Sequence, residues 1–132
     1  MPLQAFAALW NKQAFEAIKL NDALKGLEIP AEINGGIVSQ DIHVSAPDMA
    51  ENGAIVQVEI RSDIPDTESL MILVEKNPTP LIAHYRFSNG AVPFIVTRIK
   101  MAETSDIKVI AKVGHQYFTN AKKVVVLENG CG

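Results

Sequence analysis

The sequence has a single cysteine among its 132 residues, and this cysteine, Cys131, immediately precedes the final glycine. One cysteine cannot form a disulfide bond within the chain. It is compatible with the cytosol, whereas in an exported protein it indicates intermolecular pairing or a free reactive thiol. The sequence also lacks an apolar run near the ~18 residues that cross a bilayer, so we expect no membrane partner.

Blocks of charge and known catalytic motifs are absent as well. The 12 lysines and arginines and the 15 aspartates and glutamates are interspersed, with a net charge of −3, so we expect no nucleic-acid partner. The three histidines lie far apart without the spacing of metal ligands, so we expect no metal site and no cofactor. Nucleotide-binding and acyl-transfer motifs are missing too, which leaves no candidate catalytic residue.

What the sequence does contain is a change of hydrophobic period near Pro30. Residues 3–20 repeat their apolar side chains at i, i+3 and i+4, and residues 22–27 continue the pattern. Beyond Pro30 the period becomes two. The sequence therefore predicts one or two α-helices within residues 1–30, packed on a β domain that spans residues 31–127.

About seven or eight short strands are predicted in the β domain, separated by turn signals every ~8–15 residues. Residues 54–61 form a clear half-buried strand, and residues 81–100 are predicted to form a hairpin that turns at Ser88-Asn89-Gly90. Strands do not alternate with helices. We therefore predict a mainly β chain, folded as an immunoglobulin-like antiparallel β-sandwich with N-terminal helices.

The last residues, 128–132, are predicted to form a flexible tail. Gly130 and Gly132 flank Cys131, and glycine loses the most conformational freedom when it is ordered. Asn129 also tolerates unusual backbone angles. Fully extended, the tail reaches about 17 Å. A cysteine used for packing is usually buried, whereas this one can leave the body of the protein and enter another.

Nothing close in the sequence activates the thiol of Cys131. An unperturbed thiol has a pKa of about 8.5 and is only a few per cent ionised at pH 7. The Glu128 side chain and the carboxylate of Gly132 are anionic, and both oppose its ionisation. Cys131 is therefore predicted to carry a substrate, with a partner's active site supplying the activation.

Several segments resemble a known family, in the same order along the chain. They are residues 46–56 (APDMAENGAIV), 75–80 (EKNPTP), 97–104 (TRIKMAET), 124–126 (VVV) and 129–132 (NGCG). These segments are similar to those of SoxY, the sulfur-carrier family of the bacterial thiosulfate-oxidising (Sox) system. The family ends in G-G-C-G-G, so Asn129 replaces a glycine here and the last glycine is missing.

The resemblance implies a carrier without catalytic activity, which holds sulfur intermediates covalently on Cys131 and pairs with SoxZ, a second β-sandwich protein. It implies transient partners: a c-type cytochrome complex that joins thiosulfate to the cysteine, a dimanganese thiosulfohydrolase and, in some organisms, a sulfane dehydrogenase. It also implies a periplasmic location, so we expect a mature form without its signal peptide.

Two alternatives stay open. Ile55, Met71, Leu73 and Ile82 lie off the inward pattern and are candidates for an exposed face covered by a SoxZ-like subunit, unless both faces of the central strands are buried.

The alternative function is a non-carrier β-sandwich interaction module whose Cys131 forms an intermolecular disulfide. A carrier of the ubiquitin type fits less well, because such proteins end in Gly-Gly.

Overall fold

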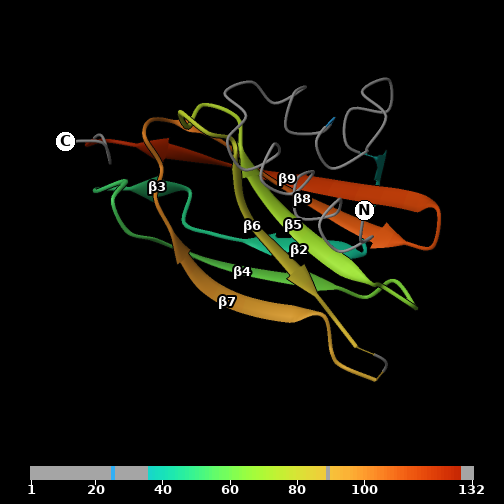
Figure 1. Cartoon of the computed structure of the whole chain (residues 1–132). Helices are drawn as coiled ribbons and strands as arrows, with labels where there is room; N and C mark the ends of the chain where they lie inside the picture. Colours follow the sequence, from blue (N-terminus) through green and yellow to red (C-terminus); the bar gives the residue numbers. More distant parts are fainter. Residues whose placement is uncertain (1–24, 26–35, 89, 129–132) are drawn as a thin grey trace, which may run out of the picture.

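The computed structural model describes Lys25 and residues 36–88 and 90–128, where nine strands form two sheets packed face to face (Figure 1). The strands are β1 (Ile37–Val38), β2 (Ile42–Ser45), β3 (Met49–Ala50), β4 (Val56–Ser62), β5 (Ser69–Val74), β6 (Leu81–Arg86), β7 (Phe94–Ile99), β8 (Ser105–Val113) and β9 (Gln116–Val126). Of the helices predicted within residues 1–30, the described residues include only Lys25, which is helical, and the rest lies outside these ranges. In the part of the chain that is described, no helix is long and apolar enough to span a membrane.

One sheet has the strand order β1-β9-β8-β5-β6, with β3 also paired to β9, and the other has the order β2-β4-β7. Neighbouring strands are antiparallel except for β1 and β3, which run parallel to β9. The predicted immunoglobulin-like sandwich is therefore confirmed. The two parallel pairs are an addition that the sequence did not predict.

The core lies between the two sheets and follows the period of two. In β4, residues Val56, Val58 and Ile60 are buried while the residues between them are exposed. The buried core residues that pack with them are Ile42, Ala50, Leu70, Ile72, Val74, Ile99, Met101, Ile107, Val109, Ala111 and Val124. Each fully buried Val, Leu or Ile side chain contributes about 1.5–3 kcal/mol, so this layer is the main source of stability.

The hairpin predicted over residues 81–100 is wrong. Strand β6 pairs with β5 in one sheet and β7 pairs with β4 in the other, so residues 87–93 cross from sheet to sheet. Gly90 does lie in a turn, with a φ of 84°. This connection is longer than the two to five residues of a hairpin loop, which gives the chain room to change sheets.

Four chain segments meet at one end of the sandwich. The end of β9, strand β3 and the β5–β6 and β7–β8 connections all lie on the left side of Figure 1. The β4–β5 connection and the β8–β9 turn lie at the opposite end. The left end matters for function because β9 leads there into the segment that carries Cys131.

Candidate functional site at the end of strand β9

The four predicted carrier residues, Asn129, Gly130, Cys131 and Gly132, lie outside the described residues. What the structure describes is the base of this segment. Strand β9 ends at Val126, and the described chain continues to Glu128. The site is therefore built from the contacts that hold residues 125–128, which set the point from which Cys131 is presented.

On one edge, β9 is held by strand β3 and the residues on either side of it. Three backbone hydrogen bonds of 3.0 Å join them: Val125 N–H to Asp48 O, Leu127 N–H to Ala50 O, and Gly53 N–H to Glu128 O. An ion pair between the Lys122 ammonium and the Asp48 carboxylate adds a contact at the surface. The hydrogen bond and the charge of Lys122 lower the pKa of Asp48 below its usual value.

On the opposite edge, a threonine side chain continues where a strand stops. The ladder between β8 and β9 ends at the pair Ser105 and Val124. Beyond it, Thr104 Oγ1 accepts a hydrogen bond of 2.9 Å from the N–H of Val126 and lies 3.5 Å from its carbonyl oxygen, to which it donates. Residues 125–128 are thus bonded on both edges after the regular ladder has ended.

A buried asparagine holds the loop that contacts Gly53. Asn77 is only 8% exposed, and its amide donates to Lys100 O at 2.7 Å and accepts from Ala102 N–H at 2.8 Å. Between these two residues, the N–H of Met101 donates to Gly53 O at 2.7 Å. Gly53 in turn donates to Glu128. Asn77 is thus linked to the end of the described chain through the backbone of residues 100–102 and through Gly53.

Sequence reasoning assigned no role to Asn77, Gly53 or Thr104, although all three stand in segments that resemble the SoxY family. These segments, residues 46–56, 75–80 and 97–104, meet at the end of β9. No local signal in the sequence could have found them, because their hydrogen bonds join segments that are far apart in the chain.

The four candidate interface residues do not form one exposed face. Ile55 is 66% exposed, and Ile82 is half-buried against the core. Met71 and Leu73 are buried, so the expectation that they are exposed is wrong. Strand β5 lies inside its sheet, between β8 and β6, and all six of its residues are buried. The alternative, that both faces of a central strand are buried, is the one the structure supports.

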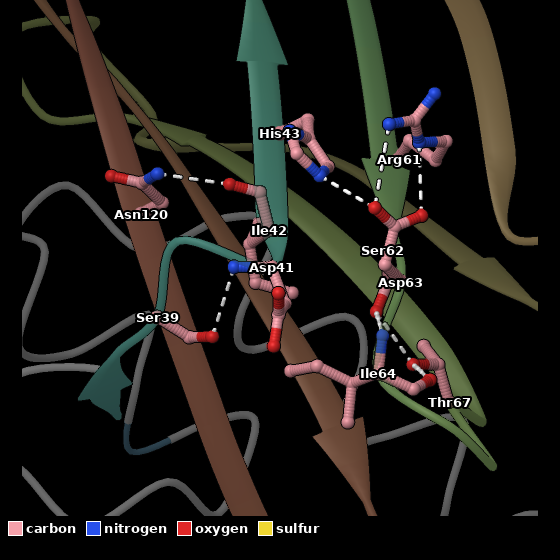
Figure 2. Close-up of polar contacts among 10 residues, drawn as sticks. All are labelled: Ser39, Asp41, Ile42, His43, Arg61, Ser62, Asp63, Ile64, Thr67 and Asn120. Carbon is pink, nitrogen blue, oxygen red and sulfur yellow. Dashed lines mark hydrogen bonds and ion pairs between the residues drawn. The ribbon is translucent and has the colours of Figure 1, made fainter.

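The histidines lie on separate elements, as their spacing predicted. His43 Nε2 lies 2.7 Å from Asp63 Oδ2, and Arg61 Nε lies 3.0 Å from Asp63 Oδ1 (Figure 2). The hydrogen bond with His43, aided by the charge of Arg61, lowers the pKa of Asp63. All three side chains are nearly half exposed, so this is a surface cluster, where ion pairs contribute little to stability.

The other two histidines contact neither this cluster nor each other. His84 is half-buried in β6, and His115 is exposed in the β8–β9 turn. Within residues 36–88 and 90–128, no group of three histidine, cysteine or acidic side chains is placed to hold a metal ion.

Comparison with protein families gives a match that covers both the sandwich and Cys131. The family model described as "Sulfur oxidation protein SoxY" matches residues 32–131. No curated protein matches the chain in sequence. The matched range includes every segment that meets at the end of β9, so the base of the tail is part of what the family shares with this chain.

Solved structures agree on the fold. The sulfur carrier protein SoxY from Chlorobium limicola f thiosulfatophilum is 28% identical, with a TM-score of 0.68, and the match covers 82% of this chain and 96% of that chain. A superoxide reductase (neelaredoxin) from Ignicoccus hospitalis is 16% identical, with a TM-score of 0.56 over 66% of this chain and 82% of that one. The latter match concerns the sandwich fold alone. On the evidence of the family match and its segments at the end of β9, the chain belongs to the SoxY family of sulfur oxidation proteins.

Proposed function

We propose that the chain is a sulfur carrier of thiosulfate oxidation, which holds its intermediates covalently on the thiol of Cys131 and presents them to partner enzymes. The observation that carries this proposal is the SoxY family match, which extends through Cys131. The described structure supports it, because the chain leading to this cysteine is bonded on both edges around Val126 and to Gly53 at Glu128.

Geometry limits how the thiol can reach an enzyme. Cys131 is the third residue beyond Glu128, so it extends at most about 10 Å from that anchored position. A partner's active site must come within this distance of the end of the sandwich. Covalent attachment keeps the substrate with the carrier during this encounter, so the carrier needs no binding pocket with high affinity.

The chemistry begins with an oxidation. The Cys131 thiol and thiosulfate form a sulfur–sulfur bond, giving the S-thiosulfonate, one proton and two electrons. A c-type cytochrome partner accepts these electrons. In the second step, water cleaves the bond between the sulfane sulfur and the sulfonate, which releases sulfate and leaves a persulfide on Cys131. A dimanganese thiosulfohydrolase partner catalyses this hydrolysis, and a sulfane dehydrogenase is proposed as a further partner.

The carrier is proposed to work in the periplasm, as a heterodimer with a SoxZ-like subunit. Ile55 is the one exposed residue among the four interface candidates, and it stands next to the loop that holds Glu128. This exposed side chain is the contact proposed for the SoxZ-like subunit.

Intact-mass measurement after turnover with thiosulfate and the partner enzymes tests the proposal. The carrier is expected to gain the mass of a thiosulfonate or a sulfane adduct, and Cys131→Ser is expected to gain neither. An unchanged mass in the native protein contradicts the carrier role. If a reducible dimer through Cys131 forms instead, the protein acts as a disulfide-linked interaction module.

A further inference from the structure

The hydrogen bonds at the end of β9 point to a function beyond holding the fold together. We propose that Thr104 and Asn77 are positioning residues, which fix Glu128 to the sandwich and thereby set the reach of Cys131. This inference rests on the proposed carrier function, since reach matters only if Cys131 bears a substrate. We call the contacts of residues 125–128 with Asp48, Ala50, Gly53 and Thr104 the anchor.

Thr104 is needed to hold Val126 on the β8 edge of β9, because the β8–β9 ladder ends before this residue. The β8–β9 ladder ends at Val124, and on the other edge β3 is only two residues long. The Thr104 hydroxyl satisfies both backbone groups of Val126 on the edge that β8 no longer covers. Without this hydroxyl, residues 125–128 are held by the β3 side alone.

Asn77 acts on the same anchor indirectly, through residues 100–102 and Gly53. Its amide fixes the backbone on both sides of Met101. Met101 bonds Gly53, and Gly53 bonds Glu128. Because a buried polar group left without a partner is costly, loss of the Asn77 amide is expected to displace residues 100–102 and loosen Gly53.

The anchor changes the length of chain that carries the thiol. With the anchor formed, three residues separate Glu128 from the far end of Cys131, a reach of about 10 Å. With the anchor released back to Val124, seven residues are free and the reach is about 24 Å. The local concentration of the thiol at a docked active site falls roughly as the −3/2 power of this length, which is about 3–4-fold.

The single cysteine allows a direct test on the full-length protein. A nitroxide spin label that reacts with thiols attaches only at Cys131, and its electron paramagnetic resonance spectrum reports the motion of that position. Thr104→Val keeps the shape of the side chain and removes the hydroxyl. We expect greater label mobility in this variant, and amide exchange at Val126 and Leu127 faster by roughly tenfold.

Thr119→Val is the matched control. Thr119 lies in β9, the strand that contains Val126, is buried, and donates its hydroxyl to Val109 O at 2.9 Å. This variant loses a comparable hydrogen bond about 23 Å along the strand from Val126 at ~3.3 Å per residue. It is expected to lower stability without changing the label spectrum or the exchange of Val126. Thr104→Ser, which keeps a hydroxyl, is expected to behave like the native protein.

Two results overturn the inference. One is a label mobility that stays unchanged in Thr104→Val, whether or not amide exchange accelerates. The other is an equal effect of Thr119→Val, which would mean that general destabilisation moves the label. If Thr104→Val does not fold, Asn77→Asp tests the same anchor, because it removes the donor to Lys100 O at constant shape. Unchanged label mobility in a folded Asn77→Asp protein then counts against the inference.

The labelling experiment needs no Sox enzyme, so its outcome is independent of the proposed function. If the label experiment contradicts the anchor, the adduct measurement on Cys131 still tests the carrier function. If no adduct forms, the label experiment still tests the anchor. If both proposals hold, partner enzymes should load Thr104→Val more slowly than the native protein, with the ~3–4-fold of a fully released anchor as the upper bound. A small-molecule disulfide should modify both proteins at the same rate.

Discussion

Asn77 and His84 are two polar residues near the same pair of strands, and their surroundings affect them in different ways. The Asn77 amide is buried, yet each of its ends has a backbone partner, so it stabilises the loop that it joins. His84 lies in β6 opposite Met71 and is half-buried. Burial opposes its charged form, and the nearby charges of Arg86 and Lys112 act in the same direction, so its pKa is lowered.

The lowered pKa of His84 predicts that stability falls in mild acid. As the pH drops below about 6.5, the usual histidine pKa, the unfolded chain gains a proton before the folded protein does. The free energy of unfolding should therefore decrease until the pH passes below the folded pKa. Urea unfolding of the native protein and of His84→Gln between pH 7.5 and 5 measures this, and the variant should lose part of the pH dependence.

His115→Gln is the control for that measurement, because His115 is exposed in the β8–β9 turn. It should keep the native pH dependence. A His84→Gln protein with the same pH dependence as the native one would show that the environment of His84 does not limit stability.

At the scale of secondary structure, the two-residue strands β1 and β3 both extend the sheet by pairing with β9. Each runs parallel to β9, and β1 places Ile37 opposite Phe118 and Val38 opposite Thr119. Gly36, just before β1, has a φ of 137°. A Cβ atom at this position would lie 2.6 Å from the backbone oxygen of Tyr117. Only glycine therefore lets β1 approach β9 this closely.

Gly36→Ala should destabilise the protein more than an alanine at another glycine of positive φ. Gly114 in the β8–β9 turn has a φ of 60° and open space around its Cβ position, so Gly114→Ala carries only the backbone penalty of about 1–2 kcal/mol. Gly36→Ala adds a clash with backbone atoms and should cost about 2–4 kcal/mol. Urea unfolding compares the two, and equal losses would contradict the close approach of β1.

The sequence was a good guide wherever one strand alone carries the signal. The alternation of Val56, Val58 and Ile60 identified the buried face of β4, because a half-buried strand has a period of two. It was a poor guide to which strands pair. An Asn-Gly turn signal cannot distinguish a hairpin from a corner between sheets, so β6 and β7 were wrongly paired.

The anchor could not be predicted from the sequence for a related reason. Its hydrogen bonds join residues that are far apart in sequence, such as Thr104 with Val126 and Asn77 with Ala102. Strands of two residues, such as β3, are also too short to show any period. The segments of the anchor could be recognised as family motifs, but only the folded arrangement explains why they occur together.

At the scale of the whole molecule, the two ends of the sandwich differ. One end gathers the three SoxY-like segments around residues 125–128, and the other carries the exposed cluster of His43, Arg61 and Asp63. Contacts that hold residues 125–128 are thus concentrated at one end. We expect variants at that end to affect presentation of the thiol, and variants at the other end to leave it unchanged.

Shortened chains should separate the anchor from the rest of the sandwich. A chain that ends at Glu128 keeps every described contact of the anchor, whereas a chain that ends at Val124 loses those of residues 125–128. Five described hydrogen bonds are lost. At about 0.5–1.5 kcal/mol for each of them, the shorter chain should be about 2.5–7.5 kcal/mol less stable. Urea unfolding of the two chains tests this, and equal stability would mean that the anchor bonds do not contribute.

The long sequence separations within the anchor also have a consequence for how the newly made protein matures. Residues 125–128 leave the ribosome later than the segments that they bond, such as residues 48–53 and Thr104. The anchor can form only after β9 has met β3 and Thr104, because contacts of large separation follow the closure of the chain between them. A thiol on a short segment beyond the anchor therefore indicates a fully folded protein. A protein that has not completed folding would present Cys131 on a longer segment.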